Sequence, residues 1–301
     1  VPGSCSSDND TAVGDDNNTI TFNALADGTY DNCTVSVTTS SGRVSDNLSV
    51  SDFTIDTTAP ELDTVNIRSN NDNTTIARVG NRIYLDLTFS ENVNTPTVLI
   101  AGQSASRHSG SGSSWVYRYD MRSSDSNGPV SLNVNFTDTL GNGPTTVIST
   151  TNGSAVLFDK TAPTLTEVTA VSTPTNDNST NYTFYSDEAG EITYSGGCDS
   201  DNETALADNN SITFNELADG PHNNCIITVT DITGNTSNNL EVSPFVIDTT
   251  APTLSPITAV STPTGDSTPN YTFSSTEAGT ISYGGACGSS SSSSASADNN
   301  T

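Results

Sequence analysis

Apolar residues along this chain occur in short runs that alternate with threonine, serine and other polar residues. In the stretch CIITVTD, residues 225–231, Cys225, Ile227 and Val229 alternate with an isoleucine and two threonines. A period of two places one set of side chains on an inner face and the other set toward solvent, as in a half-buried β-strand. Turn-forming Gly, Asn and Asp residues separate these runs, and no stretch keeps a helical period of 3.6 residues.

Two long segments of the chain each carry six predicted strands. In one segment the strands are predicted at residues 165–173, 181–186, 191–195, 211–217, 224–231 and 240–247. In the other they are predicted at residues 65–69, 82–89, 97–101, 114–121, 130–137 and 155–158. Six or seven short strands in a segment of about 100 residues, joined by turns, favour an all-β fold of antiparallel β-sandwiches.

Internal repeats divide the chain. The pentapeptide Asp-Thr-Thr-Ala-Pro occurs at residues 56–60 and 248–252, and Asp-Lys-Thr-Ala-Pro lies between them at 159–163. Residues 182–198 return with few changes as 271–287, and residues 20–38 return as 212–230. Because a fixed repeat indicates a repeated structural unit, we name the repeated unit module A and the different unit between its copies module B.

Four parts follow from this alignment. We predict the C-terminal part of a module A at residues 1–59, module B at 60–162, a complete module A at 163–251 and the N-terminal part of a further module A at 252–301. Residues 299–301 align with residues 17–19, so residues 252–301 followed by 20–59 would form one complete module A. Neither terminal part could bury a complete core alone, because repeat arrays rely on neighbours or caps. We therefore expect an excerpt of a longer array.

The charge is strongly negative and unevenly distributed. The 301 residues include 35 acids and 8 bases, for a formal charge of -27. All the bases except Arg43 lie between residues 60 and 162, so nearly all the net charge belongs to the module A parts. Such a field repels nucleic acid and anionic lipid and attracts divalent cations. We expect no nucleic-acid partner and, with no apolar run of 18 residues, no membrane span in this segment.

The five cysteines all lie in module A parts. Cys5 and Cys33 occupy the same local contexts as Cys198 and Cys225, which predicts two disulfides, and Cys287 is left without its expected partner. Buried reduced thiols are the alternative. Zinc is less favoured because the repeated pairs lack CxxC spacing and the chain has only two histidines. Disulfides indicate an oxidising, extracellular location.

The sequence resembles a known family of repeats. The stretches ARVGNRIYLDLTFSENVNTPTVLIAGQSA, WVYRYDM, FTDTLGN and FDKTAP of module B look like the bacterial immunoglobulin-like tandem repeats of giant cell-surface adhesins and filament proteins. Module A, with LADGxxxNC, VTDxxGN and IDTTAP, looks like a cysteine-bearing relative. The resemblance covers essentially the whole chain. It implies tandem immunoglobulin-like antiparallel β-sandwich domains in a linear extracellular array, and it implies no ligand.

Acidic residues cluster around the predicted joints between modules. In an immunoglobulin-like sandwich, the last strand brings the Asp of each pentapeptide beside two loops of the next domain, the loop after its second strand and the Asp-x-x-Gly-Asn turn. Oxygen ligands of this kind suit Ca²⁺. We expect interdomain sites that pair Asp56 with Glu91, Asp159 with Glu188, and Asp248 with Glu277. Asp138, Asp187 and Asp231 are further candidate ligands, and Asp27 and Asp219 are expected to face the joint from the preceding domain. The alternative is that these acids only stabilise turns and strand ends.

Aromatic residues suggest one other site. Trp115, Tyr117 and Tyr119 alternate along one predicted strand of module B, where they could form an exposed strip that stacks on sugars or could fill the core. No set of residues resembles a nucleophile with its base or a phosphate-binding loop, so we expect no enzyme.

These observations predict a structural or adhesive segment of an extracellular surface protein or filament, which acts as a stiff multi-domain spacer. Its expected partners are neighbouring copies of the same protein arranged head to tail, with polymerisation through completion of the split terminal domains and a bridge from Cys287 to Cys33. The alternative function is a carbohydrate-binding or surface-binding module in module B, with surface glycans as partners.

Overall fold

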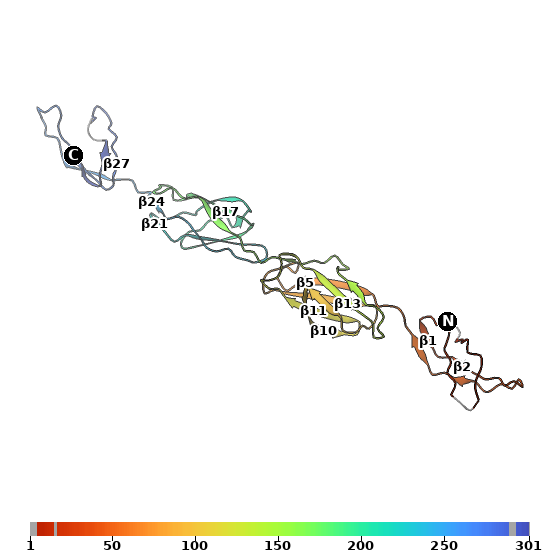
Figure 1. Ribbon diagram of the computed structural model, residues 1–301. Helices are drawn as coiled ribbons and strands as arrows, with labels where there is room; N and C mark the ends of the chain where they lie inside the picture. The colour runs from red at the N-terminus through yellow and green to blue at the C-terminus, as the bar shows by residue number, and fades with distance from the viewer. Residues whose placement is uncertain (1–4, 15–16, 289–292, 301) are drawn as a thin grey trace. The chain divides into compact units, whose positions relative to one another are not determined.

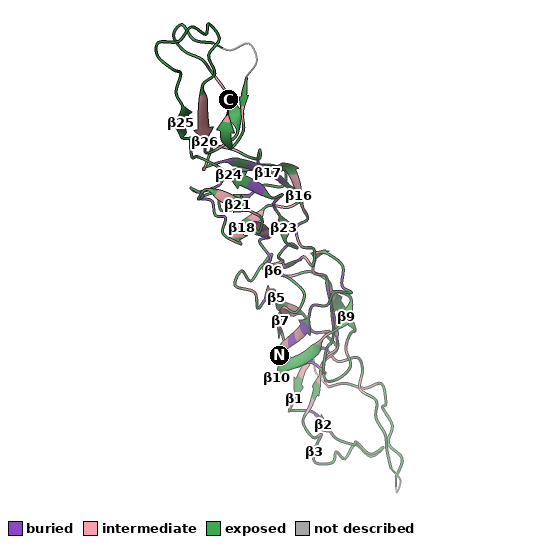
Figure 2. Ribbon diagram, turned by 90° about the vertical axis from the view of Figure 1, so that its left-hand side faces the viewer, coloured by how far each residue is buried: buried purple, intermediate pink, exposed green. Residues whose placement is uncertain are grey.

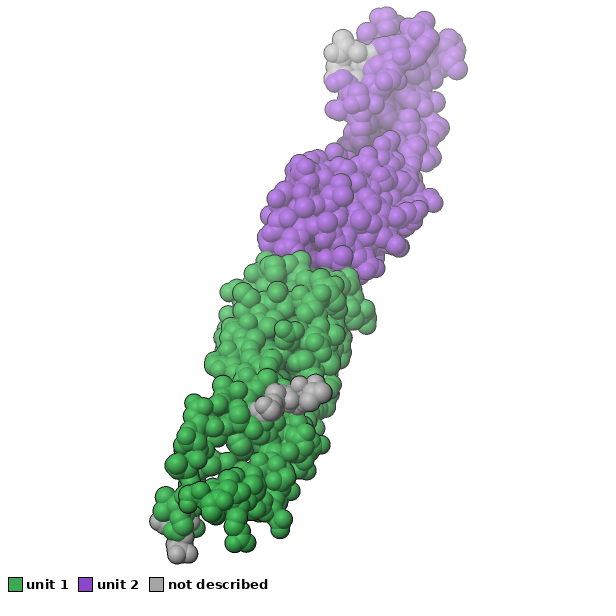
Figure 3. Space-filling view, turned by 90° about the vertical axis from the view of Figure 1, so that its right-hand side faces the viewer, with its two compact units in different colours: residues 1–161, 233–235 green, residues 162–232, 236–301 purple. Residues whose placement is uncertain are grey.

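The structure is a computed structural model that describes residues 5–14, 17–288 and 293–300 (Figure 1). Its described regular elements are all β-strands. The chain divides into two compact units, Val1–Thr161 with Thr233–Asn235, and Ala162–Ile232 with Thr236–Thr301, coloured separately in Figure 3. The predicted all-β fold class is confirmed. The division into four modules stays a prediction, although two separate hydrophobic cores lie within residues 65–158 and 171–247.

Module B is a sandwich of two four-stranded sheets. One sheet has the order β10-β11-β7-β5 and the other the order β14-β13-β8-β9. In the first sheet the strands are β5 (Leu62–Ser69), β7 (Arg82–Phe89), β10 (Ser106–Ser111) and β11 (Ser114–Asp120). In the second they are β8 (Thr97–Ile100), β9 (Gln103–Ser104), β13 (Leu132–Phe136) and β14 (Thr145–Val147).

The strand order identifies the type of sandwich. With the short strand β9 set aside, the seven strands of the two sheets follow one another as β5, β7, β8, β10, β11, β13 and β14. The first, second, fourth and fifth of these share one sheet, and the third, sixth and seventh share the other, as in immunoglobulin-like domains. A third small sheet, β12-β15-β6, is formed by β6 (Ile76–Ala77), β12 (Gly128–Pro129) and β15 (Leu157–Phe158), in which β6 and β15 are parallel.

The alternation of apolar residues puts one face of each sheet into a shared core. In β7, Ile83, Leu85 and Leu87 are buried while the residues between them are partly exposed. Val134 of β13 belongs to the same buried cluster, so the two sheets pack face to face. Figure 2 shows the buried residues of the chain in purple. The burial of about 18 large apolar side chains, at roughly 1.5–3 kcal/mol each, is the main stabilising contribution.

The complete module A repeats this plan with shorter strands. One sheet has the order β16-β17-β20 and another the order β19-β18-β22-β23, and β21 pairs with β24. The strands are β16 (Leu165–Thr169), β17 (Asn181–Ser186), β18 (Gly190–Ser195), β19 (Thr204–Ala205), β20 (Asn209–Thr213), β21 (Gly220–His222), β22 (Ile226–Thr230), β23 (Leu240–Glu241) and β24 (Phe245–Ile247). Tyr182, Phe184 and Phe214 are fully buried between the sheets.

The predicted strand at residues 240–247 is wrong in one respect, because the structure divides it into β23 and β24. Pro244 lies between them and has no N–H to donate to a neighbouring strand, so pairing is interrupted there. The predicted strand at 165–173 ends earlier, at Thr169, and that at 211–217 is shifted to Asn209–Thr213.

The terminal parts form small sheets of their own. In the N-terminal part, β1 (Gly28–Tyr30) pairs with β4 (Phe53–Ile55), and β2 (Thr34–Val35) pairs with β3 (Leu48–Ser49). In the C-terminal part the sheets are β25-β26-β29 and β27-β28. Their strands are β25 (Leu254–Thr258), β26 (Thr272–Ser275), β27 (Gly279–Thr280), β28 (Ser294–Ala295) and β29 (Asp298–Asn300).

Candidate functional site

The repeated pentapeptides are held by a turn of the module that precedes each of them. Asp27 Oδ1 accepts hydrogen bonds from the Thr57 backbone N–H at 3.0 Å and from its hydroxyl at 2.7 Å, and Asp27 Oδ2 accepts one from Thr58. Asp219 makes the same three contacts with Thr249 and Thr250. The two threonines of the pentapeptide therefore serve as donors to a carboxylate about 30 residues earlier.

A second set of contacts fixes the residue that follows the proline. The backbone N–H of Glu61 donates to Ser90 Oγ at 3.0 Å, that of Thr164 to Asp187 Oδ1 at 2.6 Å, and that of Thr253 to Thr276 Oγ1 at 2.9 Å. In each case the backbone carbonyl of the same residue accepts a bond from the N–H of the residue that binds it. Asp187, a predicted metal ligand, thus has a direct structural role in this contact.

A cluster of three carboxylates lies beside the first pentapeptide. Oxygen atoms of Asp56, Glu91 and Asp138 all lie within 4.8 Å of one another, and Asp138 is buried. Asp56 precedes β5, Glu91 follows β7, and Asp138 follows β13, so the strand order of module B brings the three together. The linker between residues 56 and 61 is therefore bordered by negative charge.

Asp138 is rigidly held by the turn that it begins. Its Oδ1 accepts the backbone N–H groups of Leu140, Gly141 and Asn142 at 2.9, 2.6 and 2.7 Å. The Asn142 amide donates to Asp138 Oδ2 at 2.7 Å and to the Asp56 carbonyl at 3.0 Å. Burial alone would raise the pKa of Asp138, but these hydrogen bonds outweigh it and lower that pKa.

Glu91 is the carboxylate of the cluster whose charged form is disfavoured by its surroundings. Burial raises its pKa, and the negative charges of Asp56 and Asp138 raise it further. Within the described residues, no hydrogen bond reaches the Glu91 carboxylate. A divalent cation would relieve this repulsion, and three carboxylates supply oxygen donors of the kind that Ca²⁺ accepts. The residues present therefore fit such an ion.

Glu188 and Asp231 repeat the pairing of Glu91 with Asp138. Glu188 and Asp231 have carboxylate atoms within 4.8 Å of each other in the second unit. Asp159 Oδ1 accepts bonds from Asn127 and from the Thr161 N–H, and Asp248 Oδ1 accepts the Thr250 N–H. Among the described residues, no cluster of three possible metal ligands includes Asp248 or Glu277.

Both predicted disulfides form. Cys5 is bonded to Cys33 and Cys198 to Cys225, with Cα atoms 5.7 and 5.3 Å apart, whereas Cys287 is a free, exposed thiol. Cys198 follows β18 and Cys225 precedes β22, so the bond links the ends of two neighbouring strands. Closing a loop of 27 residues stabilises the module by roughly 3–4 kcal/mol in the chain-entropy model.

His222 lies close to the second disulfide but has a structural role. It stacks on Phe245 with ring centroids 5.1 Å apart, and its Nε2 lies 2.9 Å from the Ala218 carbonyl. Tyr30, at the aligned position of the N-terminal part, donates in the same way to the Ala26 carbonyl. Because both cysteines are oxidised, they offer no thiolate to a metal ion.

The idea of an exposed aromatic strip on module B is wrong. Trp115, Tyr117 and Tyr119 are only 4%, 3% and 5% exposed and belong to the core. The indole N–H donates to the Gly112 carbonyl, and the Tyr117 hydroxyl donates to the Pro96 carbonyl. The period of two along β11 places all three rings on the inner face, where their polar tips are satisfied.

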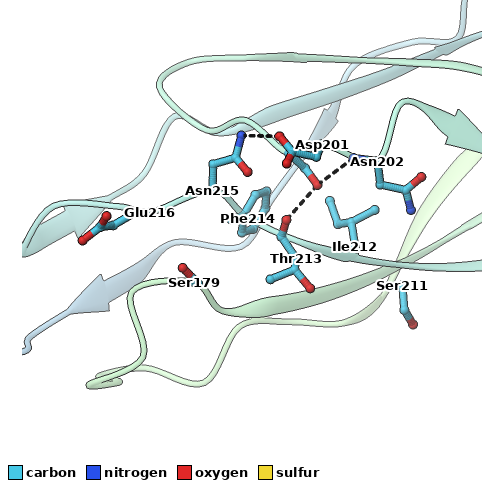
Figure 4. Close-up of a pocket in the computed structure, with 10 residues that line it drawn as sticks. Ser179, Asp201, Asn202, Ser211, Ile212, Thr213, Phe214, Asn215 and Glu216 are labelled. Atoms are coloured by element: carbon cyan, nitrogen blue, oxygen red, sulfur yellow. Dashed lines mark hydrogen bonds between the residues drawn. The ribbon is translucent and has the colours of Figure 1, made fainter.

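A hollow of about 600 Å³ lies over β20 in the complete module A (Figure 4). Asn215 donates to Asp201 at 3.2 Å across it, and Ser200 donates to the Thr213 carbonyl. Its lining residues include two acids but no histidine or cysteine. The hollow therefore offers no nucleophile with an adjacent imidazole base.

Comparisons with known proteins add little. No family model matches the sequence, and no curated protein matches it either. One solved structure, described as "Crystal structure of DIP-gamma IG1+IG2", shares 10% identity over 63% of this chain and 98% of that chain, with a TM-score of 0.33. The assignment of immunoglobulin-like sandwiches rests on the strand order given above. No described helix is long and apolar enough to cross a membrane.

Proposed function

We propose that this chain is a structural spacer segment of an extracellular surface protein or filament, built from immunoglobulin-like modules whose joints are kept short and stiff. The observation that carries the proposal is the capture of the linker on both sides. One turn of the preceding module binds the threonines of the pentapeptide, and one loop of the following module binds the residue after proline. Only Ala59 and Pro60 of the first linker lie between these anchors, and proline itself restricts the backbone.

Two further observations support the extracellular assignment. Disulfides form and persist mainly in oxidising compartments, and this chain contains two of them. Sequence resemblance to the repeats of bacterial adhesins points the same way. A surface rich in serine, threonine and acids suits prolonged exposure to salty water.

We also propose that Ca²⁺ binds at Asp56, Glu91 and Asp138 and stiffens the first joint. These residues would supply carboxylate oxygens, and the backbone bonds that hold Asp138 would keep the site in place. The observation behind this proposal is the approach of the three carboxylates to within 4.8 Å of one another, where their mutual repulsion favours a bound cation. The ion would connect a residue of the linker with two loops of module B, so that bending at the joint would break ligand bonds.

The test is thermal unfolding of the whole chain in excess Ca²⁺ and in chelator, followed by the fluorescence of Trp115. Because Trp115 is the only tryptophan and lies in the core of module B, its signal reports on that module. Calcium at a hundred times its dissociation constant should stabilise the module by about 2.7 kcal/mol, which corresponds to a rise in the midpoint of roughly ten degrees or more.

Glu91→Gln sharpens the test, with Glu61→Gln as the matched control beside the same joint. Replacing Glu91 should raise the midpoint in chelator, because repulsion is removed, and should abolish most of the response to calcium. The control should respond as the native chain does. Equal midpoints of the native chain in calcium and chelator would overturn the metal proposal and leave the hydrogen bonds and proline to hold the joint.

The carbohydrate-binding alternative loses its main support, because the aromatic side chains that suggested it are buried. Truncating Trp115 should therefore unfold module B instead of removing a binding surface.

A further inference from the structure

We propose that Cys198, His222 and Cys225 form a binding site for Zn²⁺ when the disulfide of the complete module A is reduced. All three residues lie in the second compact unit and within one module. In the reduced chain the ion would hold together the two segments that the disulfide joins in the oxidised chain. The site goes beyond the spacer function and does not rest on it.

The three side chains meet at one end of the sheet that contains β18 and β22. Cys198 follows β18, Cys225 precedes β22, and His222 ends β21. A ring nitrogen of His222 and the two sulfur atoms all lie within 4.8 Å of one another. Zinc binds cysteine sulfur at about 2.3 Å and histidine nitrogen at about 2.0–2.1 Å, so ligand atoms that share one ion are about 3–4 Å apart. The sulfurs must therefore separate on reduction, whereas the imidazole is already near.

His222 is held in a tautomer that suits a metal ligand. Its Nε2 lies 2.9 Å from the Ala218 carbonyl oxygen, which can only accept a hydrogen bond, so the neutral ring carries its proton on Nε2. Nδ1 therefore keeps its lone pair for an ion. Histidines that bind metal ions usually donate their other ring N–H to a backbone carbonyl or a carboxylate in this way. Stacking on Phe245, with ring centroids 5.1 Å apart, fixes the plane of the ring.

A cavity beside Cys225 provides a path to the site. It has a volume of about 440 Å³ and is lined by residues 223–226 and 241–244. Cys225 itself is only 2% exposed, so the cavity gives a small reductant or a hydrated ion a way to approach it while the module stays folded. A water molecule in the cavity would complete the coordination, because three protein ligands and one water form a common zinc arrangement.

The other disulfide among the described residues lacks the third ligand. Tyr30 occupies the position of His222, stacks on Phe53 with ring centroids 5.2 Å apart and donates to the Ala26 carbonyl at 2.9 Å. A tyrosine thus fills the same structural role without a ring nitrogen. The sequence HNNC of the complete module stands as YDNC in the other copy. Two residues between the ligands, as in HNNC, are also the spacing of CxxC zinc motifs.

The change of state takes two balanced steps. A dithiol reductant supplies two electrons and two protons to the disulfide, which becomes two thiols, while the reductant closes into its own disulfide. Zn²⁺ then displaces both thiol protons and forms two zinc–sulfur bonds and one zinc–nitrogen bond. A disulfide oxidant reverses the change: the two cysteines rejoin, the oxidant takes up two electrons and two protons, and the ion is released.

The experiment uses the whole chain with Cys5, Cys33 and Cys287 replaced by serine, so that Cys198 and Cys225 are the only thiols. The chain is reduced with a dithiol, which is then removed in the absence of oxygen, and is titrated with Co²⁺ as a coloured substitute for Zn²⁺. We expect the intense near-ultraviolet absorption of cobalt–thiolate bonds, with one such site per chain, and its loss when Zn²⁺ is added. The oxidised chain should give no such absorption.

His222→Tyr is the matched variant, because the tyrosine can keep both the stacking on Phe245 and the hydrogen bond to the Ala218 carbonyl, as Tyr30 does in its own copy. Second-shell partners of zinc ligands contribute about 10–100-fold to affinity, so removal of the ligand itself should weaken cobalt binding by about a hundredfold or more. His108→Tyr, which changes the only other histidine, should bind as the parent chain does. The absence of cobalt–thiolate absorption in the reduced parent, or equal affinities of the parent and His222→Tyr, would overturn the proposal.

Discussion

The turn residue that hydrogen-bonds to the pentapeptide is an Asp in two modules, Asp27 and Asp219, and an Asn in the third, Asn127. The sequence of the pentapeptide differs accordingly. Where the pentapeptide is Asp-Thr-Thr-Ala-Pro, two hydroxyl groups donate to Asp27 or Asp219. Between residues 159 and 163, Lys160 replaces the first threonine, and Asn127 instead donates to Asp159 and Thr161 and accepts from the Lys160 N–H. The turn residue and the pentapeptide residue that it binds therefore differ together, although Asn127 and Lys160 are 33 positions apart.

Asp219→Ala should loosen the linker without unfolding its module. The hydroxyls of Thr250 and Thr249 and the Thr249 N–H lower the pKa of Asp219, so these bonds favour its ionised form. Their contribution to stability is therefore fully present above the unfolded-state pKa and is lost as the pH falls through the lowered folded-state pKa. We expect weaker protection of the Thr249 N–H from hydrogen exchange, relative to the intrinsic exchange rate at the same pH, in the variant and in the native chain at acid pH.

Glu241→Ala is the control, since Glu241 is exposed on β23 and makes no such contact within the described residues. Equal exchange at Thr249 in both variants would show that the carboxylate does not hold the linker.

At the level of elements, the sequence predicts strands well where one face is buried. The alternation in β7, β11 and β13 is regular, and the predicted ranges agree with the structure to within a few residues. By contrast, β10 escapes prediction because its sequence, SRHSGS, is polar and exposed along its whole length, so it is held by backbone pairing with β11 and by contacts of Arg107 and His108 with aromatic rings. An edge strand of this kind leaves no periodic signal to read.

The residues around the linkers could also be predicted only in part. The repeated pentapeptide and the acids near it can be found from the sequence, because repetition marks them. Their partners could not be found: Ser90 and Thr276 are ordinary hydroxyl residues in strand-end loops, and their bonds to the linker depend on how the chain folds. The direction of the aromatic strip on β11 also required the sheet, because a period of two does not say which face is buried.

Gly196→Ala and Gly197→Ala form a test of the turn that leads to Cys198. Both glycines have positive φ, 77° and 93°, where any other residue costs about 1 kcal/mol or more. Only at Gly196 would a Cβ also meet the segment that leads into the neighbouring strand β22, 1.6 Å from the Asn224 carbonyl oxygen. We expect Gly197→Ala to lose about 1 kcal/mol of unfolding free energy and Gly196→Ala clearly more, as measured by denaturant unfolding. Equal losses would mean that the strand can move aside.

At the scale of the whole molecule, the negative charge is concentrated in the module A parts. Module B is nearly neutral, whereas the module A parts hold all but a small share of the net charge of -27. Like charges on successive parts repel over about one Debye length, close to 10 Å at 0.1 M salt. Sodium and calcium ions both screen this repulsion, but only a bound ion restrains a joint.

Small-angle scattering in sodium chloride and in calcium chloride, matched in ionic strength, separates these effects. If calcium binds at Asp56, Glu91 and Asp138, millimolar calcium should narrow the distribution of intramolecular distances in the native chain, while sodium should change it only gradually. Glu91→Gln should remove the calcium-specific part and keep the response to sodium. An identical response to both salts would assign the acidity to solubility and screening alone, with the hydrogen bonds of Asp27, Asn127 and Asp219 left as the restraint on the linkers.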